Sequence, residues 1–141
     1  QKAESIYRDD FYDIPIIGAD TIVVLGRTVM GKPINRQDAF NMLKTLANNV
    51  HEVITGLAIL YRGKTHFDLA VTRVYFTDIS GEEIDSYLDS GEYRDKAGAY
   101  GIQGKASVFI EKIEGCYFNV VGFPLHLFYK MLKQIGIEIY R

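Results

Sequence analysis

Residues 14–25 read IPIIGADTIVVL, an apolar run rich in isoleucine and valine with a single aspartate, Asp20, inside it. This pattern predicts two β-strands, over about 14–19 and 21–30, with an interruption near residues 26–27. Aspartate is depleted in strands and is costly to bury without a partner. Asp20 is therefore either a turn aspartate bonded to nearby backbone N–H groups or a functional carboxylate that meets a counter-charge, a metal or a proton to be moved.

A cation follows this run in the segment Gly31-Lys32-Pro33. The glycine lets a ligand approach the backbone closely, and the proline stops the strand. A lone lysine at a strand end is usually just exposed to solvent. Lys32 could instead supply a counter-charge to Asp20, since the two residues lie near the ends of adjacent predicted strands. A carboxylate and an ammonium placed in this way are the minimal parts of a phosphate-ester site.

Amphipathic helices and long strands alternate along the rest of the chain. Capping signals mark two helix starts, Asn35 with Asp38 and Ser80 with Glu83. We expect, in chain order, the end of a helix at 2–9, a helix at 36–47, a hairpin of strands at 50–62 and 65–78, a helix ended by Gly91, a glycine-rich loop at 92–105, a strand at 106–113, and a last helix between Pro124 and Gly136. Helices interspersed with long hairpin strands predict an α/β fold with a mixed central sheet flanked by helices.

The composition is that of an ordinary globular protein. The chain has 141 residues, of which 48% are hydrophobic and 24% charged, and its net charge is -2. These values predict a single domain over 1–141, and the scattered basic residues predict no nucleic-acid partner. No apolar run approaches the roughly 20 residues that cross a bilayer, and the single cysteine, Cys116, allows no disulfide within the chain. We therefore expect a reducing, cytoplasmic setting and no membrane partner.

Five motifs occur in an order and spacing that resemble those of the Maf family, whose members are nucleoside triphosphate pyrophosphatases. The motifs are Ala19-Asp20-Thr21, Gly31-Lys32-Pro33, HEVITG at 51–56, DKAGAYGIQG at 95–104 and NVVGFPL at 119–125. The resemblance runs from about the first residue to the last helix. It implies a fold like that of the inosine triphosphate pyrophosphatase class, with the site in a cleft beside the central sheet. The implied reaction is hydrolysis between the α- and β-phosphates, with a Mg²⁺ or Mn²⁺ ion as cofactor.

The resemblance also implies roles for five residues. Asp20 would hold the divalent ion or act as general base for the attacking water, and Lys32 would contact the phosphates. Thr21 would contact the substrate through its hydroxyl, unless it is only a strand former. Gln103 would read a uracil or thymine edge through its amide, and because the 7-methyl-GTP branch carries Glu-Gly at this place, the implied substrates are dTTP and UTP. Lys2 matches a lysine that faces the phosphates.

One feature of the family is missing from these residues. Maf proteins open with a strand and a Ser-x-Ser-Pro-Arg-Arg loop, whereas this chain begins at Gln1, inside what would be the family's second helix. We expect such a segment to supply a strand, a helix and an arginine phosphate clamp. The 141 residues alone would then self-associate, as a homodimer or more, or fold poorly, and would show little turnover. Two alternatives stay open: a 7-methyl-GTP pyrophosphatase, which Gln103 argues against, and a non-catalytic remnant that binds nucleotide or a partner linked to septum formation.

The remaining polar candidates have structural interpretations. The three histidines, His51, His66 and His126, lack metal-ligand spacing. The charged run RDK at 94–96 is typical of a solvated face. Tyr100 could stack on a base, but with 10 tyrosines in the chain a core or surface role is the default.

Overall fold

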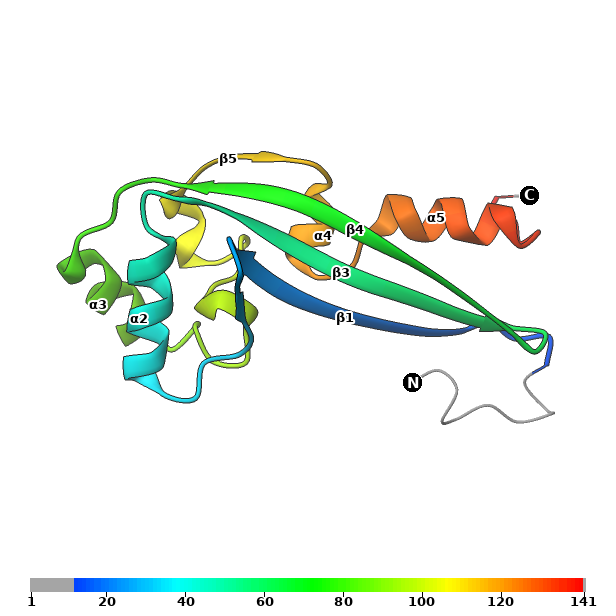
Figure 1. Cartoon of the computed structure of the whole chain (residues 1–141), viewed down its shortest axis with the longest axis horizontal. Helices are drawn as coiled ribbons and strands as arrows, with labels where there is room; N and C mark the ends of the chain where they lie inside the picture. The colour runs from blue at the N-terminus through cyan, green and yellow to red at the C-terminus, as the bar shows by residue number, and fades with distance from the viewer. Residues whose placement is uncertain (1–11, 141) are drawn as a thin grey trace.

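The computed structural model describes residues 12–140, which form a five-stranded sheet with the strand order β2-β1-β3-β4-β5 (Figure 1). The strands are β1 (Ile16–Leu25), β2 (Thr28–Met30), β3 (Val50–Tyr61), β4 (Lys64–Phe76) and β5 (Ile110–Glu114). The predicted α/β class with a central sheet is confirmed. In place of the predicted mixed sheet, every pairing within the described part of the chain is antiparallel. The turn after β1 reverses the chain, so β2 runs opposite to β1. The connection through α2 brings β3 to the other side of β1 in the same direction as β2, so β3 is also antiparallel to β1.

Two tight turns set the register of the strands. The interruption predicted near residues 26–27 is a two-residue turn that joins β1 to β2. Between β3 and β4, the turn residues Arg62 and Gly63 have φ values of 50° and 76°. Two consecutive positive φ values are typical of the type I′ turn, whose twist matches that of the flanking strands. The predicted hairpin is therefore confirmed.

Helices pack at both ends of the long strands, with α2 and α3 at one end and α5 at the other (Figure 1). The helices are α2 (Arg36–Leu46), α3 (Gly81–Asp89), α4 (Tyr117–Val121) and α5 (Leu125–Gln134), with 3-10 helices η2 (Ala97–Ala99) and η3 (Lys105–Phe109). The strand predicted over 106–113 is wrong in its first half, which forms η3. This helix starts where the Glu92 carboxylate accepts the Lys105 N–H and the Gly104 carbonyl accepts the Ser107 N–H. Within residues 12–140, no helix is long and apolar enough to span a membrane.

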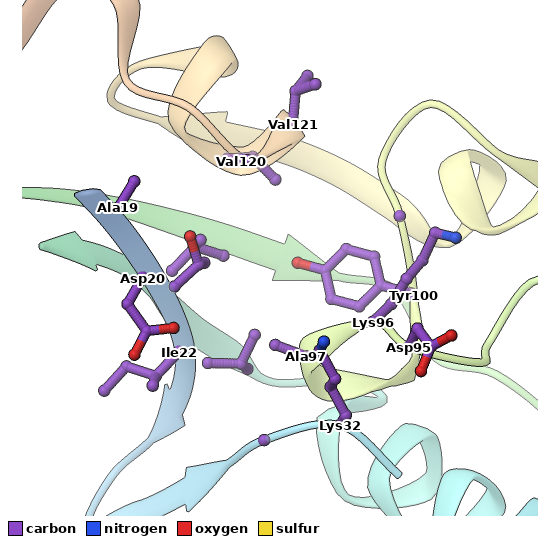
Figure 2. A pocket seen from close by; sticks show the side chains of 16 residues that line it. Ala19, Asp20, Ile22, Lys32, Asp95, Lys96, Ala97, Tyr100, Val120 and Val121 are labelled. Carbon is purple, nitrogen blue, oxygen red and sulfur yellow. The ribbon is translucent and has the colours of Figure 1, made fainter. Parts of the chain in front are cut away.

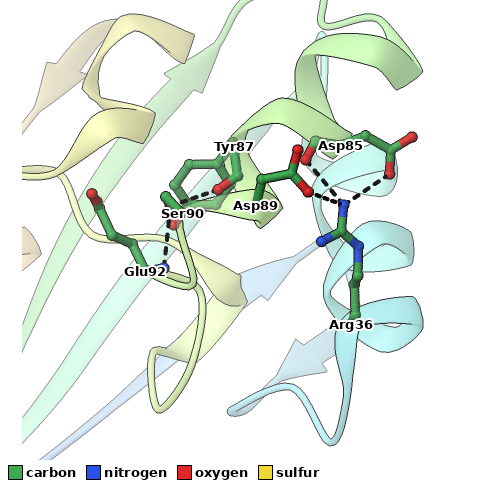
Figure 3. Close-up of polar contacts among 6 residues, drawn as sticks. All are labelled: Arg36, Asp85, Tyr87, Asp89, Ser90 and Glu92. Atoms are coloured by element: carbon green, nitrogen blue, oxygen red, sulfur yellow. Dashed lines mark hydrogen bonds and ion pairs between the residues drawn. The ribbon is translucent and has the colours of Figure 1, made fainter.

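Local side-chain bonds fix the start of α3 and its packing on α2. Ser80 Oγ accepts the Glu83 N–H at 3.1 Å, and the Glu83 carboxylate accepts the Ser80 N–H at 2.9 Å, so the predicted capping box is confirmed. Arg36 of α2 forms ion pairs with Asp85 at 3.6 Å and Asp89 at 2.9 Å (Figure 3). Because these charged groups are exposed, their pairing contributes little to stability.

Two clusters of buried side chains lie on one face of the sheet. Val23, Val53 and Leu57 share this face, because alternate residues of a strand point to the same side and the β1–β3 register aligns them. The larger cluster packs this face against α2 and α3, through side chains that include Leu43, Leu46, Ile84 and Leu88. The smaller cluster packs β3 against α5, through Leu57, Ile59, Met131 and Leu132.

Candidate functional site

A pocket of about 550 Å³ opens between the two hydrophobic clusters (Figure 2). Val23 and Tyr100, which line it, belong to the larger cluster, and Ala19 packs against the smaller one. The volume is typical of small-molecule sites. Its walls bring together segments that are distant in the sequence: residues 19–23, 31–32, 53, 95–97, 100–101 and 120–122.

Asp20 lies on β1 at the rim of this pocket, and its side chain is exposed. Over 16–22, β1 pairs only with β3 among the described residues, because β2 reaches no further than residues 23–25. The carboxylate therefore stands at a sheet edge. It has no hydrogen-bond or ion-pair partner within residues 12–140. The turn interpretation of Asp20 is wrong, since the residue sits inside a continuous strand and bonds no backbone group of the described chain.

Lys32 lies on the other side of β1 from the Asp20 carboxylate (Figure 2). Both residues line the pocket, but no ion pair joins them, so Lys32 is not a direct counter-charge to Asp20. The lysine is exposed and has no carboxylate partner in the described part of the chain. A Cβ placed on Gly31 would meet no atom within 4 Å, so the backbone beside Lys32 is open to a ligand.

Thr21 points to the opposite face from Asp20, as strand alternation requires. Its Oγ1 lies 2.8 Å from Thr55 Oγ1 across the β1–β3 pair. Thr55 is fully buried, whereas Thr21 is half-buried and lines the pocket. If Thr55 donates its hydroxyl hydrogen to Thr21 Oγ1, the buried O–H of Thr55 has a partner, so we assign the donor role to Thr55. The hydroxyl hydrogen of Thr21 is then free to bond a ligand in the pocket.

The segment after α3 brings a second lysine, Lys96, to the pocket (Figure 2). Three residues of this segment have positive φ: 60° at Asp95, 70° at Gly98 and 69° at Ala99. Residues other than glycine rarely adopt this region, and such strain persists only where the surroundings fix it. The Gly98 N–H donates to the Gly31 carbonyl at 3.1 Å. This bond ties the segment to the residue that precedes the first lysine of the pocket.

Tyr100 forms an almost fully buried wall of the pocket. Its Oη lies 2.6 Å from Nε2 of His51, which is 1% exposed and whose Nδ1 has no partner. Burial lowers the pKa of His51 to about 4 and raises the pKa of the Tyr100 phenol. Phe76 packs edge-on against both rings. His51 is therefore a neutral core histidine, and Tyr100 is a core residue whose surface closes one side of the site.

The structure brings together three of the residues that the resemblance names, Asp20, Thr21 and Lys32. Gln103 is exposed and lies outside the pocket lining, in the same glycine-rich segment as the lining residue Gly101. Lys2 lies outside the described residues. The roles of Gln103 and Lys2 stay predictions.

Sequence reasoning missed two charged lining residues, Asp95 and Lys96. The charged run at 94–96 resembles the charged surface segments of any soluble protein. It differs from them only in that a glycine-rich segment follows it directly. Among residues 12–140, no cluster of three or more His, Cys, Asp or Glu could hold a metal ion by itself. The Asp20 carboxylate alone suits Mg²⁺ by its chemistry, because this ion commonly takes one or two carboxylates together with substrate phosphates and water; Asp95 lies across the pocket from it (Figure 2).

Comparison with known proteins gives a consistent result. Residues 1–135 match the family described as Maf-like protein. The chain is 45% identical over 139 residues to the dTTP/UTP pyrophosphatase of Thermococcus kodakarensis, a match that covers 99% of this chain and 73% of the relative. For the dTTP/UTP pyrophosphatase of Syntrophomonas wolfei, the identity is 49% over 143 residues, with 100% and 75% covered. The identity to the dTTP/UTP pyrophosphatase of Clostridium botulinum is 48% over 126 residues, which cover 88% of this chain and 65% of the relative. The chain, with its pocket between two buried clusters, belongs to the Maf-like protein family.

Proposed function

We propose that this protein is a nucleoside triphosphate pyrophosphatase that hydrolyses dTTP and UTP to the monophosphate and pyrophosphate. The observation that carries the proposal is the similarity to two relatives named dTTP/UTP pyrophosphatase, at 45% and 49% identity over 99% and 100% of this chain. A match of that extent includes the whole pocket. The pocket supports it chemically, because its open carboxylate and ammonium groups suit a phosphate ester and a water to be activated.

The proposed reaction adds water across the α–β phosphoanhydride. The water oxygen forms a bond to the α-phosphorus, the bond from that phosphorus to the bridging oxygen breaks, and pyrophosphate leaves with the electron pair. Asp20 acts as the general base that takes a proton from the water and passes it to solvent. Lys32 offsets the negative charge that builds on the leaving pyrophosphate. Thr21 donates its free hydroxyl hydrogen to an oxygen of the substrate.

Further contacts complete the proposal. A Mg²⁺ or Mn²⁺ ion held by the substrate phosphates would neutralise phosphate charge when bound. Asp20 would be a ligand of that ion as the alternative to its role as general base. Gln103 reads the thymine or uracil edge through its paired donor and acceptor, and Lys2 faces the phosphates. A reducing, cytoplasmic setting is part of the same proposal, supported by the low cysteine count, since the single cysteine Cys116 allows no disulfide within the chain.

The Asp20→Asn variant tests the carboxylate, because it keeps the shape of the side chain and removes its charge. We expect turnover of dTTP and UTP to fall roughly 10²–10⁴-fold, with little change in Tm because the residue is exposed. Asp78→Asn is the matched control, since Asp78 is exposed and outside the pocket lining. Near-normal turnover in Asp20→Asn would remove this residue from the mechanism. Inorganic phosphate as the first wild-type product, or a clear preference for 7-methyl-GTP, would overturn the proposed function.

A further inference from the structure

We propose that Lys96 is a second phosphate-binding residue, which together with Lys32 forms a two-ammonium site for the pyrophosphate part of the substrate. The inference rests on the proposed function and adds a substrate contact to it. Both lysines line the same pocket, although they come from segments far apart in the chain (Figure 2). The backbone bond from Gly98 to Gly31 holds these two segments side by side.

Gly101 provides the space in which the Lys96 side chain lies. A Cβ placed on Gly101 would be 2.9 Å from Lys96 Cε and 3.2 Å from Lys96 Cδ, and beyond its chain neighbours it would meet no other atom within 4 Å. The φ of Gly101 lies outside the left-handed region that favours glycine. Its backbone torsion therefore does not demand a glycine, but a Cβ at this position would displace the end of the Lys96 side chain from its present course.

The backbone of Lys96 belongs to a hydrogen-bonded segment with an unusual torsion at Ala99. Its carbonyl accepts the Ala99 N–H at 2.9 Å, and the Ala99 carbonyl in turn accepts the buried Tyr87 hydroxyl at 2.9 Å. Ala99 keeps a φ of 69° in this setting. Strained backbone that the surroundings over-determine clusters at ligand-binding sites. The Lys96 side chain therefore starts from a backbone that is held in place beside the pocket.

The ammonium of Lys96 has no ion-pair partner within residues 12–140, although a carboxylate, Asp95, directly precedes it. Lys32 is likewise unpaired in that part of the chain. The pocket lining holds these two ammonium groups together with the Asp20 and Asp95 carboxylates. The ammonium groups suit the terminal phosphates of a nucleoside triphosphate, which form a multivalent anion. Lys96 thus fits the leaving group, and its contribution should appear both in turnover and in the binding of free pyrophosphate.

The first test compares Lys96→Ala with Lys44→Ala, which removes the same charge from the exposed last turn of α2. We expect Lys96→Ala to lower kcat/KM for dTTP about 10- to 100-fold, the usual range for one lost bond to a charged group. The inhibition constant of inorganic pyrophosphate should rise by a similar factor. Lys44→Ala should change neither value by more than about twofold.

The second test uses Gly101→Ala, which should fold normally and displace the Lys96 stem. Alone, it should weaken dTTP turnover and pyrophosphate binding about tenfold. In the Lys96→Ala background it should have little further effect, because the only atoms that its Cβ would meet are gone. An additive loss in the double variant would mean that Gly101 acts on the ligand directly and would overturn the proposed arrangement.

The two proposals fail in different ways. If the wild type forms monophosphate and pyrophosphate but Lys96→Ala matches Lys44→Ala, the proposed function stands and Lys96 is only solvated. If the wild type does not form these products, the proposed function is wrong. Calorimetric titration with inorganic pyrophosphate then still tests Lys96, because equal affinity in the wild type and in Lys96→Ala would overturn the phosphate-binding role.

Discussion

At the scale of single residues, the pair of His51 and Tyr100 connects the buried core to the pocket wall. The imidazole Nε2 lies 2.6 Å from the phenol oxygen, and both side chains are almost completely buried. In the described part of the chain, the other ring nitrogen of His51 has no partner. A charge on this imidazole would therefore be buried without compensation, which is why the pKa of His51 falls to about 4.

This lowered pKa predicts a pH dependence of stability. The ordinary His pKa of 6.5 exceeds the folded value of about 4, so the unfolded state binds more protons between these pH values. The free energy of unfolding should therefore rise with pH across this window, and acidification from pH 7 to pH 4 should remove about 3 kcal/mol through His51 alone. Urea unfolding of His51→Gln should show a shallower dependence on pH, while the exposed control His126→Gln should follow the wild type. Identical slopes in His51→Gln and wild type would contradict this origin.

The sequence predicts part of the site at this scale and misses the rest for a physical reason. Asp20 and Lys32 stand out by residue type and local context, whereas Thr21 is named only by the resemblance to the Maf family; the structure places all three at the pocket. The wall formed by Tyr100 and the position of Lys96 depend on which segments the sheet and its loops bring together. A charged run such as 94–96 looks the same in one dimension whether it faces solvent or a pocket.

At the scale of elements, the well-predicted features are those whose signals are local. The turn at Arg62 and the capping box at Ser80 need only their neighbours, and both are confirmed. Helix α4 is five residues long and has no side-chain cap, so neither periodicity nor a start signal marks it. Helix η3 begins because Glu92, from a distant position, accepts the Lys105 N–H at 2.8 Å. A contact of that kind cannot be read from the segment 106–113 itself.

Helix α4 owes its place on the sheet to Asn119, which is fully buried. Its Nδ2 shares its two hydrogens among three acceptors, the Val53 carbonyl at 3.1 Å, the Ala70 carbonyl at 3.2 Å and Thr72 Oγ1 at 3.0 Å. Thr72 Oγ1 also bonds both backbone groups of Cys116, directly before the helix. The two valines that follow Asn119 line the pocket, so these bonds set the position of that wall.

We expect Asn119→Ala to lower the free energy of unfolding by about 2–4 kcal/mol, since it removes bonds to buried acceptors and leaves a cavity. Asn41→Ala, at an exposed position on α2, should cost less than about 0.5 kcal/mol. Urea unfolding curves with equal m-values for all three proteins measure the difference. A loss below about 1 kcal/mol for Asn119→Ala would show that other contacts hold α4 in place.

At the scale of the whole molecule, the site depends on the register of the sheet and on both core clusters. Strand β1 carries Asp20 and Thr21, on opposite faces, along its pairing with β3. A slip of one residue would exchange the two side chains and would also turn the buried face of β1 outward. The larger cluster fixes the wall at Tyr100, and the smaller one holds the end of the pocket at Ala19. Local motifs thus become a site only when the complete sheet has formed.

Hydrolysis of dTTP in oxygen-18-labelled water tests most directly whether this pocket directs water to the α-phosphorus. Mass spectrometry of the products shows which phosphorus received the oxygen of the water. We predict that the label appears in thymidine monophosphate, that the released pyrophosphate carries none, and that Asp20→Asn slows the incorporation without changing its site. Label in the pyrophosphate, or thymidine diphosphate and inorganic phosphate as the first products, would contradict the proposed reaction at this site.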